Sequence, residues 1–322
     1  MSRNLFYRAA NIVQLCRFTL LVGSKSLCTQ IPAEPLTVRQ QNNGIRSIIL
    51  NNPKKRNALS LSMLESLRSN ILADIDSDDL RVIVISAKGP VFSSGHDLKE
   101  LTSAQGRDYH TKVFQACSEV MTLIQDIPVP VIAMVNGVAT AAGCQLVASC
   151  DIAVVTEKST FATPGVNVGL FCSTPAVAIG RAVPKKVAME MLFTGSPISA
   201  QDALLHGLVS KVVPEERLEH ETLAIARRVC QASRPVVALG KATFHRWPRG
   251  GMRPTLQPLV SWWITWLSET DRRGYGPSLR NGSLYGQTKQ RRPMMSDICW
   301  AGLPWPVRGQ QPLDWRREPV DG

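Results

Sequence analysis

The segment from Val131 to Val155 constrains the fold more than any other part of the chain. It opens with five apolar residues, 131–135, which predict a buried strand. A turn at Asn136-Gly137 and small residues from Ala139 to Gly143 then lead into an apolar helix, and a second buried strand is expected at 152–155. A loop of this kind leaves free backbone N–H groups at the start of a helix, where the helix dipole adds partial positive charge. The segment therefore suits an anion, or an oxygen that becomes anionic.

A second strand followed by a glycine turn lies earlier in the chain. Residues 82–86 predict a buried strand, and after Gly89 a polar segment, 91–101, continues around Gly95. Two such turns can each direct one backbone N–H at the same oxygen, which is the arrangement that stabilises an oxyanion or enolate. Small residues at these turns also serve close packing, so the pattern by itself leaves that interpretation open.

Residues 34–245 alternate strands with helices over a length typical of one domain. The alternation predicts a parallel α/β organisation. Ser60 and Ser199 are expected to cap two of the helices. The expected helices cover 61–72, 110–126, 176–181, 185–193, 199–206 and 215–230, and further strands are expected at 45–50 and 208–213; segment 164–175 is expected to be a loop.

Four motifs, in this order, resemble the crotonase (enoyl-CoA hydratase/isomerase) superfamily: NNPKKRNALS, FSSGHDLKEL, PVIAMVNGVATAAGCQLVASCDIAV and LFTGSPISAQDALLHGLVSKVVP. The resemblance covers residues 35–245. It implies an α/β fold built as a spiral of ββα repeats, with an acyl-CoA thioester held in an oxyanion hole. By position in the motifs, the oxyanion donors would be the backbone N–H groups of His96 and Ala142. For the intact family fold the resemblance also implies a homo-trimer or hexamer.

The resemblance further implies which residues contact coenzyme A, the expected ligand or substrate. The basic turn at 54–56 would suit the adenosine phosphates, with a solvated turn as the alternative. Asp97 is also expected to order its loop. The expected CoA-binding residues are Lys54, Lys55, Arg56, His96, Asp97, Leu98 and Lys99. No other cofactor is implied, and the eight Cys show no metal-ligand spacing, so no metal site is expected.

Two residues that the hydratases of this family use are not present. In those enzymes two glutamates act as acid and base while water adds across an enoyl thioester. The matching positions hold Gln145 and Gly165, and neither can exchange a proton near neutral pH. The catalytic residues are therefore unknown. His96 is a weak candidate for a base, and residues 172–174, which would face the acyl group, have no base nearby in sequence.

Two functions remain open at this stage. The first is a mitochondrial protein of fatty acid metabolism that binds acyl-CoA thioesters without turning them over. The second is an active hydratase/isomerase, thioesterase or decarboxylase that uses other residues. Gln145 and Gly165 favour the first, and turnover assays discriminate the two.

Residues 1–33 have the composition of a mitochondrial transit peptide, which predicts a location in the mitochondrial matrix. They contain four basic residues, no Asp or Glu, and interspersed Leu and Ser. A secretory signal is the competing interpretation, but Arg17 interrupts its apolar run. Elsewhere no apolar run approaches the length that spans a bilayer.

The segment from Arg246 to Gly322 differs sharply from the preceding domain. It holds all seven Trp, is rich in Arg, Pro and Gly, and lacks helical or strand periodicity, so we expect it to be disordered. One hypothesis is translation in a shifted frame; the alternative is an ordinary disordered extension. The final helices of the family are not matched after His245, so closure of the CoA site and assembly do not follow from the resemblance. An uncovered apolar surface is expected there.

The net charge of +12 belongs mainly to the two ends of the chain. Residues 34–245 carry 21 basic and 19 acidic side chains, which gives no electrostatic case for nucleic-acid binding. Within this domain Cys117, Cys144 and Cys150 are expected to be small buried side chains rather than nucleophiles. Glu100 and Glu119 are expected to be surface charges.

Overall fold

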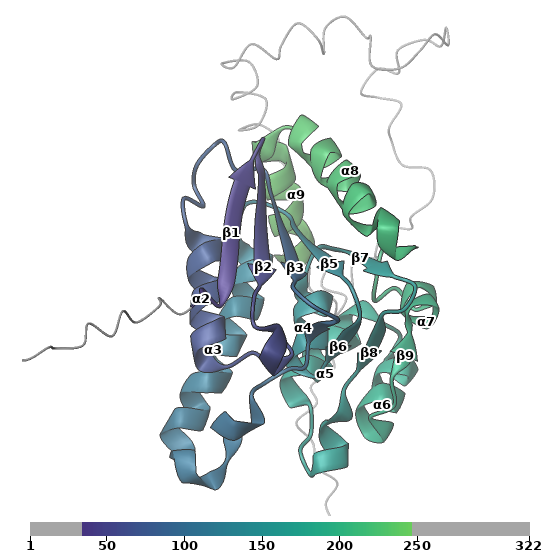
Figure 1. The fold of residues 1–322 in the computed structure, drawn as a ribbon. Coiled ribbons are helices and arrows are strands. Elements are labelled where there is room, and N and C mark those ends of the chain that lie inside the picture. Colours follow the sequence, from purple (N-terminus) through teal and green to yellow (C-terminus); the bar gives the residue numbers. More distant parts are fainter. Residues whose placement is uncertain (1–33, 247–322) are drawn as a thin grey trace, which may run out of the picture. The chain divides into compact units, whose positions relative to one another are not determined.

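Short apolar runs of β-forming residues build most of the first sheet, whose edge strand is mostly polar. In the computed structural model, which describes residues 34–246, its strands lie in the order β1-β2-β3-β5-β7-β10 (Figure 1). Their bounds are Thr37–Asn42 (β1), Ile45–Leu50 (β2), Val82–Ala87 (β3), Val131–Val135 (β5), Ile152–Thr156 (β7) and Lys211–Val213 (β10). The edge strand β1 pairs antiparallel with β2, and the other pairings in this sheet are parallel. The parallel organisation expected from the sequence is thus confirmed.

A second sheet holds the short strands that follow β3, β5 and β7 in the chain. Its order is β4-β6-β8-β9, with bounds Val91–Ser93 (β4), Val138–Thr140 (β6), Thr160–Ala162 (β8) and Ile198–Ser199 (β9). The pairs β3/β4, β5/β6 and β7/β8 each divide between the two sheets and are followed by helical structure, which confirms the spiral of ββα repeats. This sheet could not be predicted from the sequence, because strands of two or three residues are too short to show alternation.

Helices connect the strands and cover both faces of the first sheet. Their bounds are Leu61–Leu72 (α2), Gly106–Asp126 (α3), Ala142–Ser149 (α4), Ser173–Ala182 (α5), Lys185–Thr194 (α6), Ala200–Leu205 (α7), Leu218–Gln231 (α8) and Arg234–Arg246 (α9). Short 3-10 turns lie at Pro53–Lys55 (η1), Leu98–Leu101 (η2), Ser103–Gln105 (η3), Pro164–Val168 (η4) and Glu215–Arg217 (η5). The side chains of Ser60 and Ser199 accept hydrogen bonds from Met63 N and Asp202 N, so both expected caps are confirmed.

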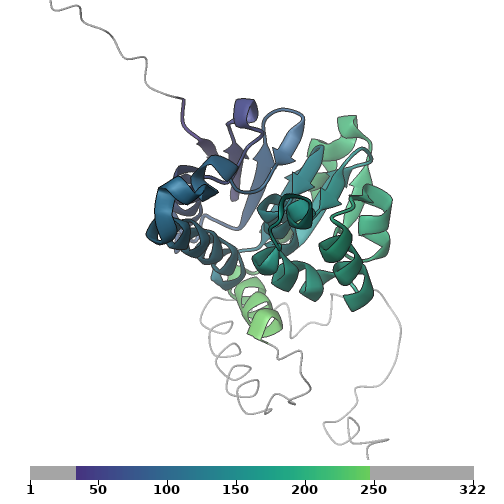
Figure 2. The same ribbon diagram turned by 90° about the horizontal axis from the view of Figure 1, so that it is seen from below.

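The hydrophobic core has one part on each face of the first sheet. Alternate residues of β3 contact α2 and α3 on one face and α8 on the other, because a parallel strand is buried on both sides. On α3 the expected inward residues are all buried: Val113, Cys117, Val120, Met121 and Ile124. Figure 2 shows the end of the fold at which the second sheet lies.

Several sequence-based boundaries need correction. Helix α3 begins at Gly106 rather than at 110, and α5 begins at Ser173, inside the segment expected to be a loop. Helix α9 was not expected; it ends at Arg246, the first residue of the predicted tail. The predicted transit peptide and the rest of the tail, 247–322, lie outside the described residues. Among the described helices none is long and apolar enough to cross a bilayer.

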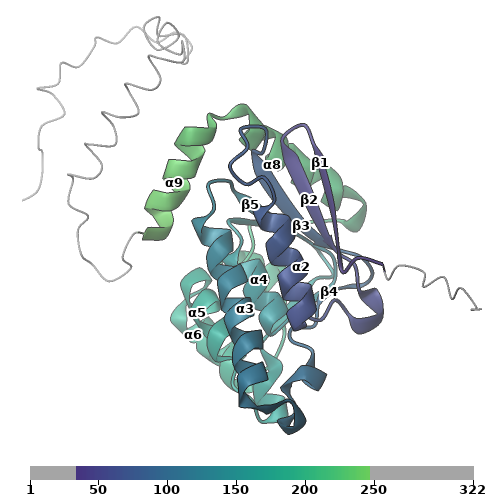
Figure 3. The ribbon, with the colours of Figure 1, turned by 90° about the vertical axis from the view of Figure 1, so that its left-hand side faces the viewer.

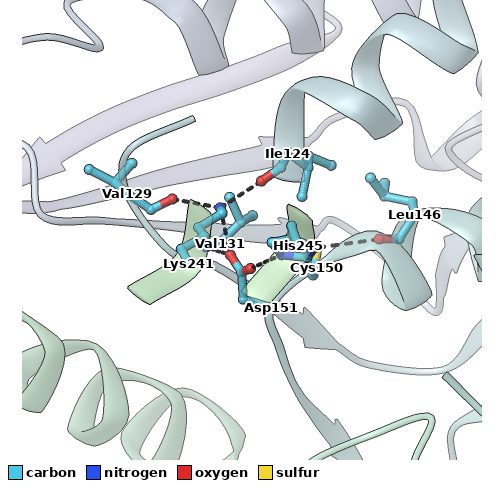
Figure 4. A network of polar contacts seen from close by, with 8 residues as sticks. All are labelled: Ile124, Val129, Val131, Leu146, Cys150, Asp151, Lys241 and His245. Atoms are coloured by element: carbon cyan, nitrogen blue, oxygen red, sulfur yellow. Dashed lines mark hydrogen bonds and ion pairs between the residues drawn. The ribbon is translucent and has the colours of Figure 1, made fainter. Parts of the chain in front are cut away.

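A buried ion pair fastens α9 to the sheet and to the end of α3 (Figure 4). The Lys241 ammonium donates to Asp151 Oδ2 at 2.7 Å and to the carbonyl oxygens of Ile124 and Val129 at 2.6 and 2.9 Å. His245 Nε2 lies 2.9 Å from the other oxygen of the same carboxylate. Figure 3 shows α9 next to the end of α3 that leads into β5. This network holds the end of α3, the start of β7 and the final described helix in one arrangement.

Candidate functional site

The two turns that the sequence singles out meet at the candidate site. Strands β4 and β6 pair in parallel, which brings the loops that follow them together. Gly95 has φ +84°, and a Cβ placed on it would lie 2.8 Å from Ala141 Cβ and 3.2 Å from Ala142 N. Ala142 is the first residue of α4, so its N–H has no acceptor within the helix. The loop residue before His96 therefore contacts the start of α4 directly.

Contacts on both sides of the ring fix the orientation of the His96 side chain. Its Nδ1 lies 3.2 Å from Leu59 O, and since a carbonyl only accepts, Nδ1 carries the proton. Burial lowers the pKa of His96, so the ring is neutral near pH 7. The ring also makes an edge contact with Phe114 at a centroid distance of 5.3 Å. These contacts fix the loop that carries the His96 backbone N–H.

Two buried side-chain atoms in the described part of the chain have no hydrogen-bond partner, and both belong to predicted site residues. They are His96 Nε2 and Gln145 Oε1. Gln145 is only 5% exposed and lies on α4, three residues after Ala142. Most buried polar atoms in folded proteins are hydrogen-bonded, so unsatisfied ones indicate where a ligand or water belongs. In the sequence Gln145 stands out by its missing charge, and in the structure it stands out by its unsatisfied oxygen.

Gly165, which occupies the position of the second missing glutamate, has little free space around it. A Cβ on Gly165 would lie 2.7 Å from Leu170 O and 2.8 Å from Cys172 Sγ. The Cys172 thiol thus occupies the space that a side chain at position 165 would need. Burial raises the pKa of Cys172, so this thiol stays protonated near neutral pH and is a poor base.

We expect Gly165→Ala to lower the free energy of unfolding by about 1–3 kcal/mol, because the added methyl overpacks the wall against Leu170 and Cys172. Urea unfolding of both proteins measures this. Gly180→Ala on α5 is the control: apart from its own turn of helix, no atom lies within 4 Å of its added Cβ, so we expect a stabilisation of about 0.5–1 kcal/mol. Equal stability of Gly165→Ala and the unmodified protein would contradict the packing described.

The expected CoA-binding residues are brought together at the rim of the site. Arg56 O accepts from Ser94 N at 3.0 Å, which places the η1 turn beside the His96 loop. Lys55 Nζ lies 3.5 Å from Asp97 Oδ2, while Asp97 Oδ1 accepts from Lys99 N at 3.1 Å. Asp97 therefore orders its loop, as expected. The side chains of Lys54, Lys55, Arg56, Leu98 and Lys99 are exposed and available to a ligand.

Glu100 is not the surface charge that the sequence analysis expected. Its carboxylate accepts hydrogen bonds from Leu61 N at 2.8 Å and from the Tyr109 hydroxyl at 3.1 Å. It thus caps the start of α2 and ties the loop after His96 to two helices. Its main partner is 39 positions away in sequence, so no local pattern could indicate the role. Glu119 is exposed and pairs with Arg68, as a surface charge does.

The cysteines of the described region behave as structural side chains. Cys117 and Cys144 are buried, and burial raises the pKa of each thiol to about 12. Cys150 is half-buried, and desolvation raises its pKa as well. Within residues 34–246 no group of three or more His, Cys, Asp or Glu side chains is placed to hold a metal ion.

A groove of about 180 Å³ lies between α3, α4 and α5, on the Gln145 side of the site. Gln145 and Ser149 line it from α4, one helical turn apart. From α3 and α5 it is lined by Ser118, Met121, Thr122, Gln125, Thr174, Val177, Ala178 and Arg181. Most of these side chains are polar. This groove could not be predicted from the sequence, because its walls come from three separate helices.

Comparisons with known proteins agree with this fold. The family model described as enoyl-CoA hydratase/isomerase matches residues 40–252. Enoyl-CoA hydratase domain-containing protein 3, mitochondrial, of Rattus norvegicus is 73% identical over 215 residues, which are 66% of this chain and 72% of that protein. The mitochondrial enoyl-CoA hydratase of Pongo abelii is 35% identical over 64% of this chain and 71% of its own length. The mitochondrial location predicted from residues 1–33 is confirmed by the names of these relatives.

Solved structures of enoyl-CoA hydratase proteins have a similar fold. The crystal structure of human enoyl coenzyme A hydratase domain-containing protein 3 has a TM-score of 0.67 and 66% identity, covering 73% of this chain and 91% of that one. The crystal structure of an enoyl-CoA hydratase from Mycobacterium smegmatis has a TM-score of 0.69 and 42% identity, with coverages of 74% and 91%.

Proposed function

Because the chain belongs to the enoyl-CoA hydratase/isomerase family, we propose that it is a mitochondrial matrix protein that binds acyl-CoA thioesters and does not turn them over. The thioester oxygen accepts hydrogen bonds from the backbone N–H groups of His96 and Ala142. In this proposal residues 1–33 are a transit peptide, and the protein acts in fatty acid metabolism. The homo-trimer or hexamer implied by the resemblance remains a prediction for this chain.

The observation that carries the proposal is the contact between Gly95 and the start of α4. A Cβ on Gly95 would approach Ala142 N to 3.2 Å. Gly95 directly precedes His96, so the backbone amides of His96 and Ala142 both lie next to this contact. Two N–H donors at one place suit an oxygen that carries negative charge, such as a polarised thioester carbonyl. Both donors are backbone N–H groups, so neither depends on which side chains occupy positions 145 and 165.

The absence of turnover follows from the groups beside that contact. Gln145 presents a carboxamide and position 165 presents only backbone, with the protonated Cys172 thiol against it. None of these groups exchanges protons readily near neutral pH. Binding needs only the amides and the CoA contacts, for which the exposed basic turn at 54–56 supplies positive charge to the phosphates.

We expect His96→Ala to retain acyl-CoA binding, weakened only as far as the loop loosens, because the donor at this position is the backbone N–H. Calorimetry with a non-hydrolysable acyl-CoA analogue measures the affinity, and thermal unfolding controls for loosening of the loop around Leu59 and Phe114. A panel of enoyl- and acyl-CoA thioesters tests turnover, and we expect none. Absence of binding by the unmodified protein would contradict the proposed function.

One observation favours the alternative, an enzyme that uses other residues. His96 Nε2 is buried, carries no proton in the neutral tautomer and has no partner among the described residues. A general base needs an unprotonated nitrogen of this kind. Turnover of any thioester that His96→Ala abolishes would establish this alternative. Binding without turnover in both proteins removes it.

A further inference from the structure

The peptide group that carries the His96 N–H is held from its other side by Leu59. Gly95 O accepts a hydrogen bond from Leu59 N at 2.7 Å, and the His96 ring donates to Leu59 O at 3.2 Å. The carbonyl and the N–H of a trans peptide point in opposite directions, so the bond to Gly95 O directs the His96 N–H away from Leu59. The direction of this proposed donor therefore depends on how the loop at 93–96 is fastened to segment 57–59.

One buried hydroxyl fastens that loop to the segment. Ser93 is fully buried at the end of β4, and its Oγ donates to Asn57 O at 2.9 Å. The same Oγ accepts a hydrogen bond from Gly95 N at 3.3 Å. A hydroxyl has one proton and two lone pairs, so it makes both bonds at once. Removing the hydroxyl takes the acceptor from a buried N–H, which is costly, so the loop is expected to shift.

Ser93 also lies against the first turn of α4. A Cβ placed on Gly143 would lie 2.5 Å from Ser93 O and 2.7 Å from Ser93 Cβ. Gly143 directly follows Ala142, and Gly95 directly precedes His96. Ser93 therefore contacts a neighbour of each proposed oxyanion donor, and its position fixes the spacing between the two.

We propose that Ser93 is a positioning residue for the thioester oxygen. Its hydroxyl holds Gly95 so that the following N–H, that of His96, points at the same place as the Ala142 N–H. It acts through the backbone and does not touch the ligand. This inference rests on the proposed function, since it places the thioester carbonyl at His96 and Ala142. The competing interpretation is that the hydroxyl only stabilises the fold.

The test measures what the carbonyl oxygen contributes to binding. Butanoyl-CoA is compared with S-butyl-CoA, a thioether that has the same chain and lacks the carbonyl oxygen. Calorimetry on the full chain is expected to show the thioester binding at least about tenfold more tightly, which is about 1.4 kcal/mol. Ser93→Ala is expected to reduce that ratio to about twofold or less, because one donor no longer reaches the oxygen. The ratio of the two affinities cancels the contribution of the CoA contacts.

Ser159→Ala is the matched control. Ser159 is likewise buried, in the turn between β7 and β8, with its Oγ 3.3 Å from Val135 O and 2.9 Å from the Thr156 hydroxyl oxygen. We expect both alanine variants to lower the melting temperature and only Ser93→Ala to lower the ratio. Ser93→Cys keeps the shape of the side chain with a weaker donor, so it is expected to give an intermediate ratio.

The outcomes separate this inference from the function on which it rests. If Ser93→Ala keeps the full ratio, or if Ser159→Ala lowers it as much, the positioning role is overturned and thioester binding stands. If Ser93→Ala does not fold, the ratio measured for Ser93→Cys decides in the same way. If the unmodified protein binds neither compound, or binds both equally well, the proposed function itself fails.

Discussion

Replacing Lys241 with Met is expected to lower the free energy of unfolding by about 3–5 kcal/mol, because it removes the buried ammonium that pairs with the half-buried carboxylate of Asp151. The Ile124 and Val129 carbonyl oxygens lose their donor at the same time. Native domains have about 5–15 kcal/mol of stability, so the loss is a large fraction of the total. Chemical unfolding at pH 7 measures it.

A second ion pair in the protein provides the control. Lys158 and Glu215 form an exposed pair on the surface, each with more than half of its side chain accessible to solvent. Lys158→Met is expected to cost less than about 1 kcal/mol, because water screens an exposed pair. In a double-mutant cycle, Asp151→Asn should lower the free energy of unfolding much less in the Lys241→Met variant than in the unmodified protein. Equal effects of Lys241→Met and Lys158→Met would contradict the buried network.

Gly95→Ala is expected to reduce acyl-CoA affinity at least about tenfold, since the new methyl would lie 2.8 Å from Ala141 Cβ and push the two loops apart. The separation removes one of the two N–H donors from the thioester oxygen. Residue 95 also has φ +84°, where an L-residue costs roughly 1–2 kcal/mol. Calorimetric binding and urea unfolding, measured on the same preparation, report the two effects.

Gly207→Ala separates the clash from the backbone strain. Gly207 has the same φ of +84°, but its Cβ would lie 3.4 Å from Ala182 O, an ordinary contact. We expect this variant to lose stability and to keep its acyl-CoA affinity. If Gly95→Ala also bound acyl-CoA normally, the two loops would not form the binding site.

Local sequence patterns predicted the elements whose signals lie within a few residues. The run 131–135 became β5, the stripe on α3 faced the core, and Ser60 capped α2. The second sheet and helix α9 were missed, because strands of two or three residues carry too little periodicity and α9 is held mainly by distant partners.

The site was predicted in part, for a similar physical reason. The motifs identified the two turns, and the resemblance identified His96, Ala142, Gln145 and Gly165 within them. The Glu100 cap, the Cys172 thiol against Gly165 and the Asp151–Lys241 pair all depend on contacts between distant segments. Only the folded arrangement shows which of these groups meet.

The central claim concerns two distances, from a bound thioester carbonyl oxygen to the amide nitrogens of His96 and Ala142. A crystal structure of the chain with a non-hydrolysable acyl-CoA analogue measures both. We predict that each is about 2.7–3.1 Å and that no carboxylate of the protein contacts the acyl group. Amides that point apart, or a carboxylate that reaches the acyl group, would contradict the account.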